Sequence, residues 1–193
     1  MGTVFYTGGG DWGETSLNGG RRVPKDDIVV EVLGLLDQVN AEIAVTKVGL
    51  PDSLHEIRPI LDRTQDRLFS LGAEVASLPD ASPSSVLLGE EDLREVERDI
   101  DHLGRHVGEL HEFVVPGGCA TSARLHLVRT MVRGAERAMV SLGRVHPVRH
   151  EAVVYLNRLS SLFFVLALWA NRKDGYEERA PRYLHRGEVS ARS

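Results

Sequence analysis

Apolar residues recur at steps of three and four in five separate segments of this 193-residue chain. This spacing is typical of amphipathic α-helices, whereas half-buried strands alternate every second residue. The connections between the segments are short, and no convincing pair of strands appears. We therefore expect an all-α fold, an up-and-down bundle of about five helices.

The first two helices are expected on either side of Pro51. The first should begin near Asp26 or Asp27, and the second should run from about Ser53 to the Pro- and Ser-rich loop at 77–85. Their inward residues would be Ile28, Val32, Leu35, Val39 and Ile43 in the first helix, and Leu54, Ile57, Leu61, Leu68 and Leu71 in the second.

Three further helices follow that loop. The third covers 90–113, the fourth covers 123–143 after a Pro-Gly-Gly turn, and the last starts after Pro147. The last helix is apolar nearly all round, so it should be central. Its run at 162–170 is about half of the roughly 20 residues that a membrane span needs, which favours a core helix. The inward stripe of the fourth would be Leu125, Val128, Val132, Ala135, Met139 and Leu142.

Length and composition favour a single domain. With 42% hydrophobic residues the chain can bury a sizeable core, and we divide it into a glycine-rich arm at 1–25, a helical bundle at 26–174 and a tail at 175–193. The net charge of −5 argues against a general nucleic-acid surface. One cysteine, Cys119, and no signal-peptide pattern predict a cytoplasmic protein that does not span a membrane.

The arm contains a G-x-G-x-x-G match at Gly8, Gly10 and Gly13. It is not a dinucleotide fingerprint, because a strand before it and a helix after it are both lacking. Glycines allow close backbone approach to phosphate, and nearby hydroxyls and an amine could assist. The alternative is a flexible arm. The assisting side chains would be Thr7, Thr15, Ser16 and Lys25.

Arginines form a ridge on the fourth helix. Arg129, Arg133 and Arg137 follow one another at i,i+4 steps, with Glu136 beside them. A solvated basic face is one interpretation. A polyphosphate site is the other, because the guanidinium fork gives bidentate charge-assisted hydrogen bonds.

Two polar residues favour the second interpretation. Asp37 lies in the middle of the largely apolar first helix, where a carboxylate needs a partner such as a core-facing arginine. Asn157 comes just before the apolar stretch of the last helix. Arginine, aspartate and asparagine that converge inside a bundle would form a polar pocket.

Other candidates are weaker. His102 and His106, and His146 and His150, have the i,i+4 spacing of some metal ligands, but the H-E-x-x-H pattern is absent. Surface histidines are the favoured interpretation, and we expect no metal site built from protein side chains. Cys119 could have a lowered pKa at a helix start. However, no side chain that could act as a general base is obvious beside it, so a small packing residue is the favoured interpretation.

Taken in order, these motifs resemble the PduO-type ATP:cob(I)alamin adenosyltransferases from Tyr6 to about Asn171, nearly the whole chain. The specific part is the combination of F-x-x-P-G-G, R-T-x-x-R-x-A-E-R and Y-L-N-R-L-S. The stretches that carry the resemblance are YTGGGDWGETSL, RVPKDD, LGLLDQVNAEI, EFVVPGG, LHLVRTMVRGAER and YLNRLSSLFFVLALWAN.

The resemblance implies a homotrimer of ferritin-like, cobalamin adenosyltransferase-like bundles. ATP would lie between subunits, between the N-terminal loop of one and the arginine helix of the other, with Mg²⁺ and cobalamin as further ligands. Arg129 would pair with Asp37 at the interface. The implied ATP contacts are Thr7, Gly8, Gly9, Gly10, Thr15, Ser16, Lys25, Arg133, Glu136, Arg137 and Asn157.

The implied reaction transfers the 5′-deoxyadenosyl group of ATP to cob(I)alamin, giving adenosylcobalamin and triphosphate. Because Co(I) is the nucleophile, the protein has to position the reactants and stabilise charge. Arg133, Arg137, Lys25 and Mg²⁺ would stabilise the triphosphate, and Arg129 would assist from the interface. Phe113 would keep an axial ligand off the lower face of cobalamin. A cobalamin-dependent enzyme that receives the product is a candidate partner.

This sequence departs from the family pattern in the arm, where Gly8 and Gly9 replace a basic residue and a hydroxyl, and Trp12 stands where lysine is common. The fourth helix has Gly134 in place of an arginine, and further changes are Gln38 for glutamate and Ser161 for aspartate. Two alternatives therefore stay open: a non-catalytic relative that binds ATP or a corrinoid as carrier or sensor, and an enzyme repurposed for another nucleotide or acceptor.

Overall fold

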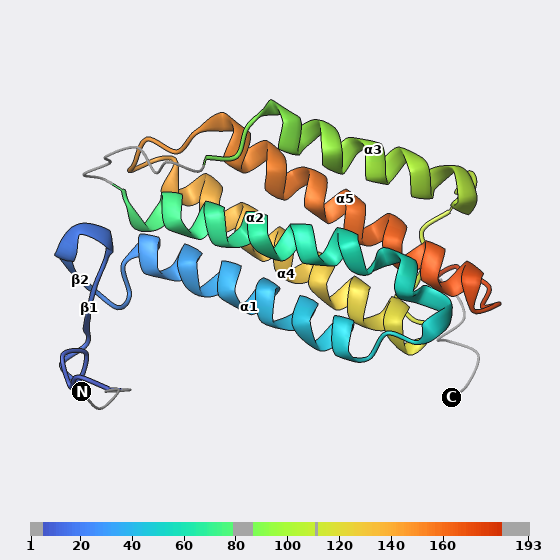
Figure 1. Cartoon of the computed structure of the whole chain (residues 1–193), viewed down its shortest axis with the longest axis horizontal. Helices are drawn as coiled ribbons and strands as arrows, with labels where there is room; N and C mark the ends of the chain where they lie inside the picture. The colour runs from blue at the N-terminus through green and yellow to red at the C-terminus, as the bar shows by residue number, and fades with distance from the viewer. Residues whose placement is uncertain (1–5, 79–86, 111, 183–193) are drawn as a thin grey trace, which may run out of the picture.

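The structure is a computed structural model that describes residues 6–78, 87–110 and 112–182. Within these residues, five long helices run alternately up and down (Figure 1). The predicted fold class is confirmed. The helices are α1 (Ile28–Val48), α2 (Arg58–Ala76), α3 (Glu90–Val107), α4 (Ala120–Leu142) and α5 (His150–Lys173).

The start of α1 agrees with the sequence. Asp27 is its N-cap, and the side-chain carboxylate accepts a hydrogen bond of 2.8 Å from the backbone N–H of Val29. This bond satisfies one of the backbone donors that a first helical turn leaves unpaired. The prediction of a helix start near Asp26 or Asp27 is therefore confirmed.

Two other helix ends differ from expectation. The segment at Ser53 belongs to a 3-10 helix, η2 (Asp52–Ile57), and α2 itself begins at Arg58 with a proline in its first turn. Proline suits that turn because its missing N–H is not needed there. The third helix does not reach residue 113, because Gly108 at φ 81° ends α3 in a conformation that favours glycine.

The expectation that the chain has no strand pair is wrong. A small antiparallel hairpin in the arm joins β1 (Glu14–Ser16) to β2 (Arg22–Pro24), with Thr15 opposite Val23. A 3-10 turn, η1 (Asn18–Gly20), connects the two strands. Each strand has three residues, which are too few to show an alternating pattern of apolar and polar residues in the sequence.

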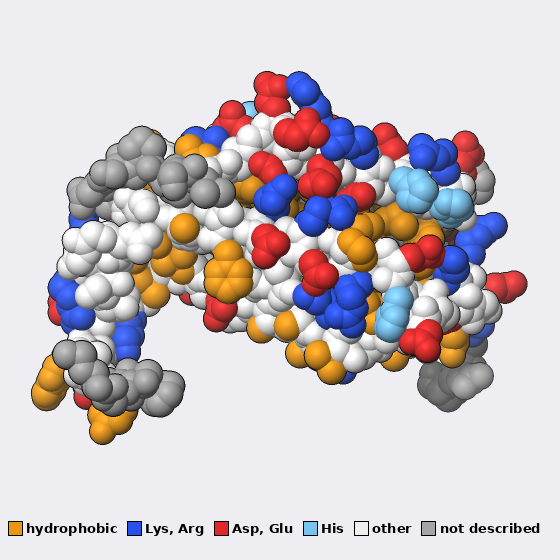
Figure 2. Space-filling model, in the orientation of Figure 1, with side chains coloured by type: hydrophobic (Ala, Val, Ile, Leu, Met, Phe, Trp, Pro, Cys, Tyr) orange, Lys and Arg blue, Asp and Glu red, His pale blue; other side chains and the backbone are white. Residues whose placement is uncertain are grey.

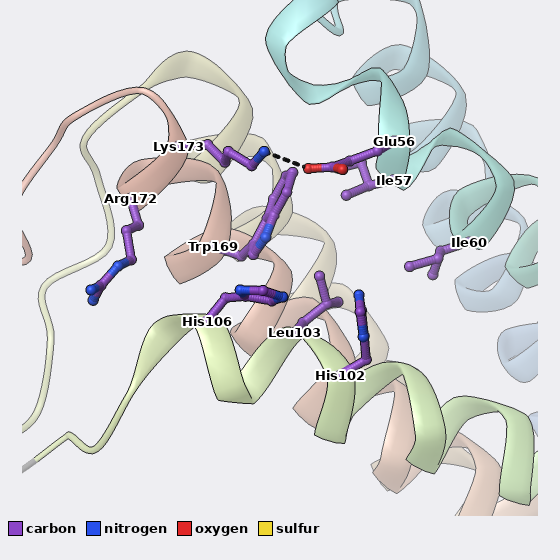
Figure 3. Close-up of a pocket in the computed structure, with 9 residues that line it drawn as sticks. All are labelled: Glu56, Ile57, Ile60, His102, Leu103, His106, Trp169, Arg172 and Lys173. Carbon is purple, nitrogen blue, oxygen red and sulfur yellow. Dashed lines mark ion pairs between the residues drawn. The ribbon is translucent and has the colours of Figure 1, made fainter.

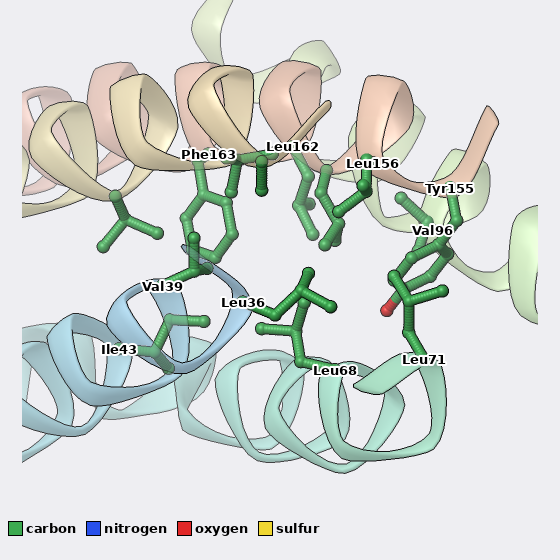
Figure 4. Packing of buried hydrophobic residues seen from close by; sticks show 14 of the residues in the cluster. Leu36, Val39, Ile43, Leu68, Leu71, Val96, Tyr155, Leu156, Leu162 and Phe163 are labelled. Atoms are coloured by element: carbon green, nitrogen blue, oxygen red, sulfur yellow. The ribbon is translucent and has the colours of Figure 1, made fainter. Parts of the chain in front are cut away.

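The core forms around α5, which packs against α3 and α4, while α1 packs against α4 and α2. Phe163 and Leu156 of α5 face Val39 of α1 and Leu68 of α2 across the interior (Figure 4). The predicted inward stripe of α4 is confirmed in full, because every one of its six members is completely buried.

Helix α5 is long and apolar enough to cross a bilayer by length and composition alone. However, 61% of its most apolar window is buried inside the protein, where it contacts the other helices of the bundle. This burial supports the core-helix interpretation, since a core helix satisfies the same length and composition test.

Charged side chains link α2 to α3 on the face shown in Figure 2, where red and blue groups alternate. Arg63 pairs with Asp99 at 2.8 Å and with Glu95 at 3.1 Å, and Arg67 pairs with Asp92 and Glu95. These groups are partly buried, so solvent screens them less than it screens exposed pairs. The network holds α3 beside α2.

Candidate functional site

The arginine ridge of α4 borders a surface groove of about 430 Å³. Arg133 and Arg137 are exposed there, as expected of a site that receives a ligand from outside. Arg144, at the turn after α4, adds a third guanidinium that the sequence analysis did not single out. The lining residues are Arg133, Glu136, Arg137, Val140, Ser141, Arg144 and Asn157.

Asn157 is held at the edge of this groove by its neighbours. Its Nδ2 donates to the Glu136 carboxylate at 2.9 Å, and its Oδ1 accepts from Nη1 of Arg158 at 3.0 Å. Arg158 also donates from Nε to Glu97 of α3 at 2.8 Å. Three helices therefore fix the orientation of the amide.

The expected polar pocket of arginine, Asp37 and Asn157 inside the bundle is not formed within the chain. The reason is that Arg133, Arg137 and Asn157 are exposed at this groove, and Asp37 lies at a different one.

The arm forms a compact loop of its own. Arg22 of β2 donates from Nη2 to the carbonyl of Gly9 at 2.7 Å and to Glu14 at 3.2 Å. The hydroxyl of Thr7 accepts from the backbone N–H of Gly9 at 3.3 Å. Arg22 thus shapes the glycine loop, a role that its position in the sequence did not indicate.

Lys25 lies directly over this loop. A Cβ placed on Gly10 would come within 3.1 Å of the Lys25 Nζ, so the ammonium lies close to the backbone of the loop. Thr15 and Ser16 lie on β1, and the hydroxyl of Ser16 accepts from Arg22 at 3.4 Å. The hydroxyls, the amine and the glycine backbone are therefore grouped in one small region.

The arm and the arginine groove lie on different parts of one chain. Figure 1 shows the β1–β2 hairpin beyond the N-terminal end of α1 and the glycine loop before β1 extending away from the bundle, whereas α4 lies behind α1 and α2. The turn of the hairpin stays attached to the bundle, because Nδ2 of Asn18 donates to the carbonyl of Ala73 at the end of α2. The glycine loop therefore extends into the space where a neighbouring molecule could lie.

Arg129 occupies an unusual environment between the groove and the core. It is half-buried, with its guanidinium 5.9 Å from the centre of the Phe164 ring, and its Nε has no hydrogen-bond partner among the described residues. Burial, together with nearby Arg133, lowers the pKa of Arg129. A half-buried arginine is stabilised when a carboxylate pairs with it, and none does so among the described residues.

Asp37 does not supply that carboxylate within the chain. It is exposed on α1, at the edge of a groove between α1 and α2. The expectation that Asp37 is buried inside the bundle is therefore wrong, because α1 turns this position outward while its neighbours Leu36 and Val39 face the core. A pairing between Asp37 and Arg129 of another subunit stays a prediction.

Phe113 lies in the loop between α3 and α4 and is 81% exposed, unusual for a large aromatic side chain. The loop is fixed by Asn171 of α5, whose Oδ1 accepts from the backbone N–H of Cys119 at 2.9 Å while Nδ2 donates to the carbonyl of Gly117 at 3.0 Å. Gly118 has φ 92°, and a Cβ there would collide with the Asn171 amide. Asn171 thus fixes the end of the loop that leads into α4, and Phe113 lies exposed earlier in the same loop.

The chain matches the cobalamin adenosyltransferase family across residues 5–170. It belongs to this family. The matched region includes the glycine loop, the Phe113 loop, the arginine ridge and Asn157, so the resemblance seen in the sequence is confirmed.

Known members of the family are similar along most of the chain. A corrinoid adenosyltransferase of Citrobacter freundii is 41% identical over 166 residues, which cover 84% of this chain and 92% of the relative. The corrinoid adenosyltransferase PduO of Salmonella typhimurium is 39% identical over 187 residues, but the match covers 55% of that longer protein.

A solved structure has nearly the same fold. A PduO-type ATP:corrinoid adenosyltransferase from Lactobacillus reuteri, a phenylalanine-to-histidine variant complexed with cobalamin and ATP, superposes with a TM-score of 0.89 at 29% identity. The match covers 93% of this chain and 97% of that one.

In this cobalamin adenosyltransferase family member, sequence reasoning missed His126. The side chain is 2% exposed on α4, one turn before Arg129, and neither ring nitrogen has a hydrogen-bond partner among the described residues. Burial and the charge of Arg129 lower the pKa of His126 to about 4, so the ring is neutral at physiological pH. Its position one turn before the arginine ridge was the signal available in the sequence.

The structure also places the weaker candidates, the cysteine and the histidines of α3. Cys119 is buried at the N-cap of α4 and burial raises its pKa, which confirms the packing interpretation. His102 and His106 are exposed as expected, with their rings edge to face at 5.3 Å between centroids. Across the described parts of the chain, no group of three or more His, Cys, Asp or Glu side chains could hold a metal ion.

Proposed function

We propose that this chain is a corrinoid adenosyltransferase, which transfers the 5′-deoxyadenosyl group of ATP to cob(I)alamin and releases triphosphate. The observation that carries the proposal is the groove on α4, where three arginines and a fixed Asn157 face solvent in a chain of this family. Guanidinium groups suit a triphosphate, whose charge they neutralise through paired hydrogen bonds.

The reaction joins cobalt to carbon. The electron pair of Co(I) attacks C5′ of ATP, a bond forms between cobalt and C5′, and the bond from C5′ to the phosphate oxygen breaks. Triphosphate leaves with that electron pair. Arg133, Arg137 and Lys25 would stabilise the charge that grows on the leaving oxygens, and no side-chain nucleophile is needed.

The site requires two subunits. The glycine loop of the arm extends away from its own bundle, and within the described part of the chain Nε of Arg129 has no hydrogen-bond partner. We therefore propose a homotrimer of one-domain subunits in which the arm of one subunit covers the arginine groove of the next. In that arrangement the exposed Asp37 of one subunit would pair with Arg129 of its neighbour.

Magnesium would enter with the nucleotide. Mg²⁺ is commonly bound by substrate phosphates and water with one or two carboxylates, and Glu136 is the carboxylate that lines the groove. When bound, the ion would neutralise part of the triphosphate charge. Glu136 would orient Asn157 at the same time through their hydrogen bond.

Phe113 would act on the corrinoid. An exposed aromatic ring on a rigid loop can cover the lower face of the macrocycle and exclude water and the axial base. Loss of these ligands makes Co(II) easier to reduce, so Phe113 would assist formation of the Co(I) nucleophile.

The decisive assay supplies ATP, Mg²⁺ and chemically reduced cobalamin, and follows the light-sensitive cobalt-carbon product by absorbance. We expect product from the natural chain and a loss of about 100-fold or more in turnover for Arg133→Ala. Arg94→Ala, which removes an exposed arginine of α3, is the matched control and should keep full turnover. Bound ATP without product would instead indicate a carrier or sensor.

The remaining proposals concern cellular context. A cytoplasmic location fits the unpaired Cys119 thiol, because reducing compartments keep thiols free. A cobalamin-dependent enzyme that receives adenosylcobalamin would be the natural partner. Retention of the labelled product in a complex with such an enzyme, measured by size-exclusion chromatography, would test direct transfer.

A further inference from the structure

Arg144 lines the groove on α4, but the mechanism described above gives it no role. It borders the groove together with Arg133 and Arg137, although it lies in the turn after α4 ends at Leu142. Its position also falls outside the R-T-x-x-R-x-A-E-R motif, which ends at Arg137. The charge that Arg144 adds to the groove therefore needs an explanation of its own.

The cations of this groove are available to a ligand. Arg133, Arg137 and Arg144 are exposed, and among the described residues no carboxylate pairs with any of them. Glu136 is the carboxylate in the lining, and it already accepts a hydrogen bond from Asn157. Three guanidinium groups beside one carboxylate leave an excess of positive charge, which favours an anionic ligand.

A second hollow, beside Trp169, lacks this excess of free cations (Figure 3). The Lys173 ammonium at its edge lies 2.8 Å from the Glu56 carboxylate, which also lines the hollow. The guanidinium of Arg172 points away from it. Free guanidinium groups therefore distinguish the groove on α4 from this hollow.

The helix arranges the three arginines along one line. Arg133 and Arg137 are four residues apart and Arg137 and Arg144 are seven apart, and both spacings return to the same face of a helix. Gly143 keeps helical dihedral angles, so Arg144 lies about 10 Å beyond Arg137 along the axis. The C-terminal end of a helix repels anions, and the last turn of α4 has no basic residue. A phosphate at this end would need the charge of Arg144.

The reaction decides the direction in which the triphosphate extends. Displacement at a carbon atom is in line, so the leaving oxygen of ATP lies opposite cobalt across C5′. Phe113, which would lie under the corrinoid, precedes the N-terminal end of α4, whereas Arg144 follows the C-terminal end. The triphosphate would therefore extend along the ridge from Arg133, past Arg137, towards Arg144.

We propose that Arg144 binds the terminal phosphate of ATP and thereby gives the groove a preference for triphosphate over diphosphate nucleotides. This inference rests on the proposed function, because it takes ATP as the nucleotide and cobalt as the nucleophile. A guanidinium fork can donate two charge-assisted hydrogen bonds to one phosphate group. These bonds are lost when the nucleotide has no terminal phosphate, so ADP binds without the help of Arg144.

The test measures nucleotide binding to the full chain by isothermal titration calorimetry, with Mg²⁺ and without cobalamin. The natural chain should bind ATP more tightly than ADP. Arg144→Gln should weaken ATP binding about tenfold or more and change ADP binding less than about twofold, because ADP lacks the phosphate that Arg144 contacts. Arg144→Lys keeps the charge without the fork, so it should weaken ATP binding less than Arg144→Gln does.

Two further arginine variants separate this role from a general loss of charge. Arg133→Gln should weaken the binding of ATP and ADP together, since both nucleotides carry the phosphates nearest to C5′. Arg94→Gln removes an exposed arginine of α3 that pairs with Glu90, and it should change the binding of neither nucleotide. Circular dichroism checks that each variant keeps its fold.

Equal weakening of ATP and ADP binding in Arg144→Gln, or unchanged binding of both, would overturn the role of Arg144. Failure of the proposed function gives a different result, because adenosyl transfer by the natural chain is measured separately. A natural chain that prefers ATP to ADP but forms no adenosylcobalamin would contradict the reaction alone. A natural chain that binds neither nucleotide would contradict both proposals.

Discussion

His126 is a buried residue whose charge state changes on folding within the range of pH at which stability can be measured. Its pKa falls from an ordinary 6.5 to about 4 because the ring is buried beside Arg129. The unfolded chain therefore takes up a proton at a higher pH than the folded chain does. Stability from this group is complete above about pH 6.5 and is lost as the pH falls from there towards 4.

We expect His126→Phe to reduce the pH dependence of stability. The natural chain should lose about 2 kcal/mol of unfolding free energy through His126 between pH 7 and pH 5, whereas the variant should lack this contribution. Urea unfolding at the two pH values, followed by circular dichroism, measures the difference. His150→Phe, at the exposed start of α5, is the control and should keep the natural slope. Equal slopes in both variants would contradict the assignment.

Gly118 fixes the backbone on which Phe113 is presented. Gly118→Ala should lower the unfolding free energy by about 2 kcal/mol, because φ 92° is strained for alanine and the new Cβ would collide with Asn171. Adenosyl transfer should fall as well, through displacement of the Phe113 loop. Gly104→Ala is the counterpart within α3, where no atom lies within 4 Å of a new Cβ.

For Gly104→Ala we expect unchanged transfer and a gain of up to about 1 kcal/mol, since alanine has the higher helix propensity. Thermal and urea unfolding of both glycine variants, together with the transfer assay, measure the two effects. A stable and fully active Gly118→Ala variant would show that the Asn171 contact is dispensable.

At the scale of elements, the position of α3 depends on charges as well as on apolar contacts. Its buried stripe is narrow, with Val96 and Leu103 the fully buried members of the helix. The arginines of α2 reach across to three carboxylates of α3, and these pairs are partly shielded from water. Side-chain pairs therefore add to the packing of α3 on α5.

Removal of one of these arginines should loosen α3. Arg67→Leu is expected to cost about 1–2 kcal/mol of unfolding free energy, because Asp92 and Glu95 would stay partly buried without their partner. Arg94→Leu removes an arginine whose pair with Glu90 is fully on the surface, so it should cost less than about 0.5 kcal/mol. Urea unfolding in low and high salt measures the loss of unfolding free energy in the two variants. Equal losses for Arg67→Leu and Arg94→Leu would argue against a stabilising role of the charge network between α2 and α3.

At the scale of the whole molecule, assembly would satisfy groups that the single chain leaves incomplete. Arg129 is half-buried and its Nε is unpaired among the residues that the structure describes, and Asp37 is exposed on another helix. A homotrimer would bring such groups together across an interface. The same interface would bring the arm of one subunit over the groove of its neighbour.

A charge exchange tests this arrangement. Arg129→Asp and Asp37→Arg should each shift light-scattering mass from trimer towards monomer, because each places like charges opposite one another. The double variant should recover much of the trimer, with the pair restored in reverse order. Arg133→Ala should keep the trimer, since its role lies with the nucleotide. Failure of the double variant to recover any assembly would argue against direct pairing.

The helical class and much of the core could be predicted from the sequence alone. The three-and-four spacing of apolar residues placed five helices and the complete inward stripe of α4, because a helix must turn one face to the interior. It also indicated the arginine ridge and Asn157, since their spacing along two helices is local. The hairpin of the arm was not predicted, because strands of three residues are too short to show an alternation of apolar and polar residues.

The partners of the polar groups, in contrast, depend on the three-dimensional packing of the helices and loops. Asn171 meets Cys119 across 52 positions of sequence, Arg22 bends back to Gly9, and Asp37 faces solvent where burial was expected. Periodicity specifies the face of a helix that turns inward, whereas a hydrogen bond or an ion pair depends on which distant residue lies opposite. The hollow beside Trp169 has the same origin, because residues of η2 and α2, of α3 and of α5 line it and none of these segments encodes a cavity alone.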